Sequence, residues 1–176
     1  MPYAQGQLDG LCGVYAIVNA IEATVANWDR TDAQSLFHFL TTSLTAEGKL
    51  PGIMALGMGR RDLGQLIDHA DTYLAAHYGL RLTRRFAFAR PTSLGQYWQR
   101  LENHLQAPGH TAIVGLCGRY AHWTCVHEMT GNTLQTLDSG TQPIQRLYRA
   151  HCTTRRLDRR RHHGLQATQT VLLKVS

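Results

Sequence analysis

The apolar pattern of this 176-residue chain changes its period near the middle, and this change limits the possible folds more than any other feature. In the first half, apolar residues recur every three or four positions, as at Leu36, Leu40 and Leu44, which is typical of helices with one buried face. In the second half, short apolar runs such as residues 111–116 alternate with turn residues, which is typical of strands. Helices followed by antiparallel strands predict an α+β fold.

We expect four helices and five strands in this order. The helices lie in residues 12–24, 31–44, 63–74 and 93–105. The strands lie in residues 111–116, 121–128, 133–137, 142–147 and 169–175. Two capping boxes, Thr31 with Gln34 and Ser93 with Gln96, are expected to begin helices. Residues 1–176 are thus predicted to form one domain, with N-terminal helices packed on a C-terminal antiparallel sheet.

Composition narrows the classes of protein to consider. The formal net charge is +6, and arginine supplies most of it because Lys49 and Lys174 are the two lysines in the sequence. No apolar stretch approaches the ~18 residues of a membrane span. The first residues lack the basic and apolar regions of a signal peptide. We therefore expect a cytoplasmic protein, or one that is exported without a cleavable signal.

The four cysteines are expected to be free thiols, because the predicted compartment is reducing. They stand at positions 12, 117, 125 and 152, and no CxxC pair occurs. Cys117, His122, Cys125 and His127 lie close together in sequence, but their strand-like alternation argues against a shared metal site. We predict neither a metal nor an organic cofactor.

Cys12 is the first candidate for chemistry, because it stands where a loop enters an almost wholly apolar helix. The positive end of a helix dipole favours the thiolate, which is the form that attacks a carbonyl carbon. Gly10 and Gly13 are expected to leave room for a substrate backbone. Gln7 precedes the cysteine by five positions, and its amide is a candidate donor to an oxyanion; Gln5, two positions earlier, competes for this role. A buried cysteine that only packs is the alternative.

His122 and Asp138 form the second candidate constellation. A Gly131-Asn132 turn separates the two strands that carry them, so a hairpin is expected to bring both side chains to one end of the sheet. Asp138 would then orient the His122 imidazole, which would take the proton from Cys12. Trp123, beside the histidine, is predicted to line the substrate groove, although core packing is its alternative role.

This order of residues resembles the papain-like cysteine peptidase superfamily, in which a helix that carries Cys packs on a sheet that carries His and Asn or Asp. Gln7 and Cys12 are similar to the Q-x-x-x-L-C pattern of Josephin-type deubiquitinases. His122-Trp123 and the downstream Asp138 resemble the C39-like bacterial peptidases. The resemblance implies a papain-like fold with Cys12 as nucleophile, His122 as base, Asp138 as orienting residue and Gln7 as oxyanion donor.

The predicted function is a cysteine-dependent hydrolase of peptide, isopeptide or glutamine amide bonds, with a thioester intermediate. Small size and arginine-rich composition fit a bacterial effector or toxin that acts on a protein or peptide substrate. A glutamine deamidase or transglutaminase-type toxin remains open, as does a catalytically silent module that binds a protein. Arg155 to His163 is basic enough to attract an acidic partner, but it also fits a solvated loop. Without interleaved aromatic residues, it does not favour nucleic acid.

Overall fold

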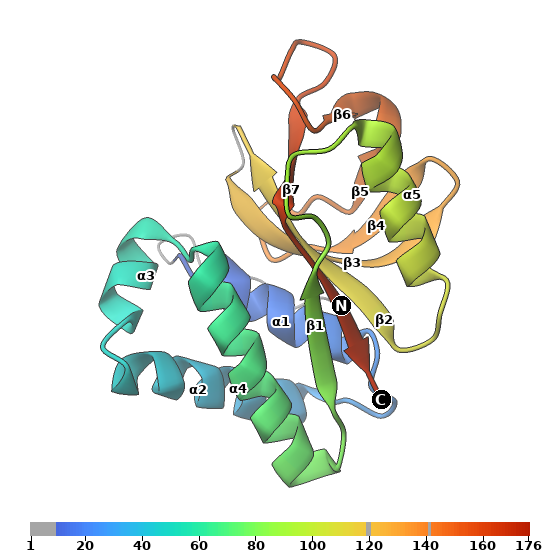
Figure 1. Cartoon of the computed structure of the whole chain (residues 1–176). Coiled ribbons are helices and arrows are strands. Elements are labelled where there is room, and N and C mark those ends of the chain that lie inside the picture. The colour runs from blue at the N-terminus through green and yellow to red at the C-terminus, as the bar shows by residue number, and fades with distance from the viewer. Residues whose placement is uncertain (1–9, 119–120, 141) are drawn as a thin grey trace.

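The computed structural model describes residues 10–118, 121–140 and 142–176, which form a mixed α+β structure of helices and one sheet (Figure 1). The first elements are helical: α1 (Cys12–Glu22), α2 (Arg30–Ala46), α3 (Leu50–Leu56) and α4 (Arg60–Tyr78). Strand β1 (Leu82–Phe86) and helix α5 (Leu94–Leu105) follow. The remainder consists of β2 (His110–Cys117), β3 (His122–Thr130), β4 (Thr133–Leu137), β5 (Arg146–Tyr148), the 3₁₀ turn η1 (Arg149–His151), β6 (Cys152–Thr153) and β7 (His163–Val175).

The described strands form one seven-stranded sheet in the order β1-β7-β2-β3-β4-β5, with β6 paired to β7 outside this path. All neighbouring pairs on the path are antiparallel, whereas β6 and β7 are parallel. The last strand of the chain, β7, therefore lies between the early strand β1 and the hairpin strand β2. This insertion joins the N-terminal and C-terminal halves into one sheet.

Helices cover both faces of the sheet (Figure 1). On one face, α1 to α4 form a core with inward residues such as Ile113 and Cys125. On the other face, α5 packs against residues such as Val114 and Val126. Strand β2 is buried on both faces, which explains why its sequence is an uninterrupted apolar run rather than an alternating one.

Helix α1 lies inside the helical layer. Nine of its eleven residues are buried, and it packs against α2, α4 and the sheet, mainly β3. The buried amide of Asn19 donates a hydrogen bond to the Leu137 carbonyl oxygen, at the end of β4, over 3.2 Å. A helix that is apolar all round belongs in such a core. This packing fixes the position of Cys12, the first residue of the helix.

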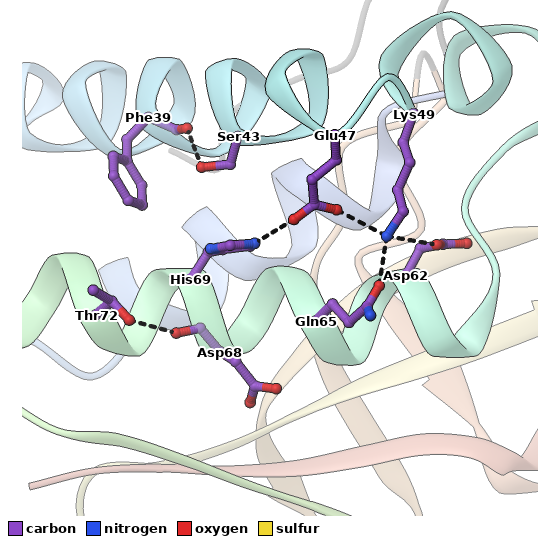
Figure 2. A network of polar contacts seen from close by, with 9 residues as sticks. All are labelled: Phe39, Ser43, Glu47, Lys49, Asp62, Gln65, Asp68, His69 and Thr72. Atoms are coloured by element: carbon purple, nitrogen blue, oxygen red, sulfur yellow. Dashed lines mark hydrogen bonds and ion pairs between the residues drawn. The ribbon is translucent and has the colours of Figure 1, made fainter.

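A network of polar contacts ties the end of α2 to α4 (Figure 2). Lys49 Nζ lies 2.8 Å from a Glu47 oxygen, 3.6 Å from an Asp62 oxygen and 2.6 Å from the Gln65 side-chain oxygen. His69 Nε2 lies 2.7 Å from the second oxygen of Glu47. The network is partly exposed, so its contribution to stability is modest, and within it one Asp62 oxygen faces Lys49.

The structure corrects several sequence-based expectations about individual elements. Helix α2 begins at Arg30 with a capping box between Asp29 and Asp32, so the predicted box of Thr31 and Gln34 is wrong. An aspartate accepts the free N–H groups of the first turn as readily as a threonine does. The Ser93–Gln96 box is confirmed. Four elements, α3, β1, η1 and β6, were not expected, and the strand predicted at residues 142–147 is reduced to β5.

Candidate active site

His122 and Asp138 meet at one end of the β3–β4 hairpin, as expected from the sequence. Gly131 has a positive φ of 57° and turns the chain, while Cys125 pairs with Leu137 across the two strands. Asp138 directly follows Leu137 and His122 lies three residues before Cys125, so both side chains stand at the end of the hairpin away from the turn. Nε2 of His122 lies 2.7 Å from Oδ1 of Asp138.

Asp138 is held by a second contact on its other oxygen. The Ile144 backbone N–H donates to Oδ2 over 2.8 Å. With 2% of the Asp138 side chain and 15% of the His122 side chain exposed, the pair lies largely out of solvent. A carboxylate fixed at both oxygens sets the orientation of the imidazole ring bound to it.

Cys12 approaches the same imidazole from the start of α1. The two side chains lie close enough for Cys12 to act on the pKa of His122 as a hydrogen-bond partner. Since Asp138 occupies Nε2, the ring nitrogen available to the thiol is Nδ1. The backbone N–H of Cys12 belongs to the first turn, where helical N–H groups have no acceptor within the helix.

The environment of His122 favours its protonated form. Burial lowers the pKa, but the hydrogen bonds and charges of Asp138 and Cys12 outweigh burial and raise the pKa from 6.5 to about 9. For Asp138, burial raises the pKa, whereas the hydrogen bond and charge of His122 lower it, with a net lowering. At neutral pH the site therefore contains an imidazolium beside an ionised carboxylate.

A cavity of about 260 Å³ opens beside Cys12 and His122. We call it the thiol cavity. One part of its wall comes from β2, the residue before β3 and β3 itself: Leu116, Ala121 and Trp123. The rest comes from the end of α3, the α3–α4 connection and β7: Leu56, Gly57, Met58, Gly59, Gln166 and Gln169. The thiol and the imidazole are thus accessible to a ligand of the size of one side chain or an extended chain end.

Trp123 fixes one wall of the thiol cavity. Its indole N–H donates to the Met58 carbonyl oxygen over 2.8 Å, and its side chain is almost fully buried. The connection between α3 and α4 therefore has a definite place beside the candidate active site. Trp123 lines the cavity and also packs in the helical-side core, and its contact with a substrate stays a prediction.

The other two residues predicted to bind substrate have a packing reason in the described structure. A Cβ atom at Gly10 would lie 2.3 Å from the Ile53 carbonyl oxygen, and one at Gly13 would lie 2.7 Å from the Met58 sulfur. Close approach of the chain to itself thus requires these glycines. The space beside them is filled by protein rather than left for a substrate backbone, and contact with a substrate stays a prediction.

Gln7 and Gln5, the two candidates for an oxyanion donor, lie outside the described residues. Sequence reasoning also missed several residues that line the thiol cavity, among them Met58, Gln166 and Gln169. Gln166 and Gln169 lie on β7, far from Cys12 in sequence, and no sequence motif marks them. The glycines on either side of Met58 were the one available signal for a close chain approach.

The basic stretch that begins at Arg155 contributes no residue to the lining of the thiol cavity. Arg155 to Arg161 form a loop before β7, and Leu157 anchors it where Cβ atoms at Gly118 and Gly164 would otherwise stand. Among the described residues, no three His, Cys, Asp or Glu side chains gather in a way that would hold a metal ion. None of the helices that the structure describes combines the length and apolar character of a membrane span.

No protein-family model matches the chain, and no curated protein sequence matches it significantly.

Proposed function

We propose that this protein is a cysteine hydrolase with a papain-like arrangement, in which Cys12 is the nucleophile, His122 the proton carrier and Asp138 the residue that orients it. One observation carries the proposal: an imidazole fixed by a carboxylate at 2.7 Å faces a thiol at a helix start, on the wall of one cavity. A nucleophile, a base and an orienting group in this order are the parts of a catalytic triad.

The proposed reaction begins with attack of the Cys12 thiolate on a carbonyl carbon. A C–S bond forms, and the carbonyl electrons move to oxygen, where the Cys12 backbone N–H is placed to donate a hydrogen bond. The oxyanion then collapses, the C–N bond breaks, and the His122 imidazolium gives its proton to the leaving amine. A thioester on Cys12 remains.

Water completes the cycle. His122, now neutral, removes a proton from a water molecule as its oxygen attacks the thioester carbonyl. The C–S bond breaks, a carboxylic acid leaves, and the proton restores the thiolate–imidazolium pair. The same cycle serves a peptide bond, an isopeptide bond and a glutamine side-chain amide. An amine in place of water would give transamidation.

The Asp138 contacts support the orienting role. The Ile144 N–H holds Oδ2 of Asp138, so Oδ1 is directed at His122. The pKa of His122, raised to about 9, keeps the imidazole protonated until it gives its proton to the leaving group. Titratable groups whose pKa values are shifted by burial and by a charged partner are common in active sites. The composition and size support a bacterial effector as its setting.

The test starts from the thiol and proceeds to the reaction type. We expect iodoacetamide to modify Cys12 first, as peptide mapping would show, and Cys12→Ala to abolish turnover of any substrate that the native protein processes. A peptide library, ubiquitin-based probes and glutamine-containing proteins then separate the reactions. Deamidation raises the substrate mass by about one unit because an amide becomes an acid, whereas cleavage splits the chain.

The result that would contradict the proposal is equally concrete. If Cys12 stays unmodified while the folded protein is labelled at Cys117, the thiol does not have the reactivity that the mechanism needs. A reactive Cys12 without turnover of any substrate class would instead favour a silent papain-like module that binds a protein.

A further inference from the structure

A second cavity, of about 440 Å³, has a strongly basic lining. Its wall contains Arg60, Arg61 and Arg84, together with Phe86 and residues of the first turns of α4. We call it the arginine cavity. No carboxylate is among its lining residues. Three guanidinium groups around one hollow provide many N–H donors for an anion and no acceptor.

The arginine cavity adjoins the thiol cavity along two separate elements. In the α3–α4 connection, Gly59 lines the thiol cavity and the next residue, Arg60, lines the arginine cavity. In the sheet, Gln169 of β7 lines the thiol cavity, while Val171, two residues further, pairs with Phe86 of the arginine cavity. The two cavities are therefore neighbours along both elements, which is the placement that a polypeptide extending from Cys12 into the arginine cavity needs.

Two of the three guanidinium groups, those of Arg60 and Arg84, are held in place before any ligand arrives. Arg60 Cζ lies 3.9 Å from the centre of the Phe86 ring, at cation–π distance. Arg84 binds Asp68 through two hydrogen bonds of 2.7 Å. A Cβ atom at Gly64 would lie 3.3 Å from Arg84 Cζ, so the glycine lets this arginine lie close against α4. Fixed donors lose little conformational entropy on binding.

The nearby acids leave most of this charge uncompensated. Asp68 offsets Arg84, but Asp62, the acid in the first turn of α4, points to Lys49 in the polar network (Figure 2). Arg60 and Arg61 therefore stand as two exposed positive charges at the end of α4 where the helix dipole disfavours them. Two arginines at this end of the helix lower its stability. Such unfavourable residues are expected at a site where a ligand binds their positive charge.

We propose that the arginine cavity binds an acidic side chain of the substrate polypeptide, so that the enzyme acts on glutamate- or aspartate-containing segments. This inference rests on the proposed function and assigns its substrate class. A carboxylate accepts paired N–H bonds from a guanidinium fork, which is the geometry that arginine offers best. Arg60 and Arg61 supply the free charge, and Arg84 and Phe86 position the wall.

The experiment uses short alanine peptides with a central dehydroalanine, whose double bond accepts the Cys12 sulfur at Cβ and a proton at Cα. One flanking alanine at a time is replaced by glutamate or by glutamine, and the rate of Cys12 labelling is followed by intact mass. At one flanking position, we expect glutamate to react about tenfold faster than glutamine, since one charged hydrogen bond has this effect. Added salt should reduce the ratio.

Substitutions test which arginines cause the preference for glutamate. Arg60→Gln with Arg61→Gln should bring the glutamate-to-glutamine ratio to one, and thermal melting should show that the variant folds. Arg85→Gln is the matched control: Arg85 is an exposed neighbour of Arg84 on β1, outside the arginine cavity, and acts on His104 at the other face. This control should keep the ratio.

Two results would overturn the inference. Equal rates for glutamate and glutamine at every position, or a preference that survives in the Arg60→Gln, Arg61→Gln variant, would remove the acidic-substrate assignment alone. Iodoacetamide treatment distinguishes this from failure of the proposed function, because a Cys12 that is inert to iodoacetamide removes both.

Discussion

Cys12 and Cys152 lie in the cores on opposite faces of the sheet, and both are more than nine-tenths buried. Their surroundings differ. Cys152 packs in the α5-side core, where burial raises its pKa to about 12. Cys12 contacts the His122 imidazole and borders a cavity. Burial without a charged partner makes a thiol inert, so a partner and an opening distinguish a nucleophile from a core residue.

The histidines repeat this contrast. His104 contacts the carbonyl oxygens of Thr111 and Leu173 at 3.0 and 2.9 Å, and burial lowers its pKa. His122 contacts a carboxylate, and its pKa is raised to about 9. Both rings are partly buried and hydrogen-bonded. A partner that carries a negative charge decides which ring is an acid at neutral pH.

The largest expected effect is the difference in thiol reactivity. A thiol with a pKa of about 12 is ionised to about one part in 10⁵ at pH 7. We therefore expect iodoacetamide to modify Cys12 at least 10³-fold faster than Cys152 in the folded protein. Mass spectrometry of digested samples over time measures both rates. In denaturant the two rates should converge, which provides the control.

The second prediction removes the charged partner. His122→Ala should slow alkylation of Cys12 about 10²-fold at pH 6, because the imidazolium no longer stabilises the thiolate. Cys152, on the other face, should react as before. His104→Ala is the matched change, and it should leave alkylation of Cys12 unaltered. Equal effects of the two substitutions would contradict the contrast between the histidines.

The third prediction concerns pH. In the proposed mechanism a protonated His122 serves the leaving group, so kcat/KM should fall as the pH rises through about 9. The raised pKa of His122 also stabilises the folded state. This stabilisation is fully present below pH 6.5 and is lost as the pH rises through about 9. Asp138→Asn removes the charge that raises this pKa while burial remains, so the fall should move to lower pH. A pH–rate profile of each protein measures the shift.

The smallest effect is on stability. Cys152→Ser places a hydroxyl in an apolar core and should lower the free energy of unfolding by about 1–3 kcal/mol. Cys12→Ser, beside a polar partner and a cavity, should cost about 1 kcal/mol or less. Urea unfolding followed by circular dichroism measures both. A larger cost at Cys12 would reverse the assignment of packing and chemical roles.

The elements with strong periodic patterns were predictable, and those without them were not. The apolar repeat of α2 and the turn at Gly131 indicate their structures directly. Helix α3 has seven residues and includes Pro51 and Gly52, so it has too few turns to show a period. Strand β1 contains Arg84 and Arg85 and lies at the edge of the sheet, where exposed charged residues hide the strand pattern.

The pairing of His122 with Asp138 was predictable because both residues belong to one hairpin, whose geometry follows from local sequence. The walls of the thiol cavity were not. Met58 and Gln169 reach it from elements that meet only through tertiary packing, and the arginine cavity combines α4 with β1 in the same way. Contacts between elements that are far apart in the chain leave no periodic pattern in a single sequence, so the walls of both cavities could not be predicted from it.

Trp123 gives the thiol cavity an optical reporter of its own. The indole ring borders the cavity, and its N–H donates a hydrogen bond to the carbonyl oxygen of Met58, another residue of the cavity wall. Tryptophan emission responds to changes in polarity and hydrogen bonding around the ring. With Trp28 and Trp98 replaced by phenylalanine, the fluorescence of the protein would follow occupancy of the cavity directly, without a labelled substrate.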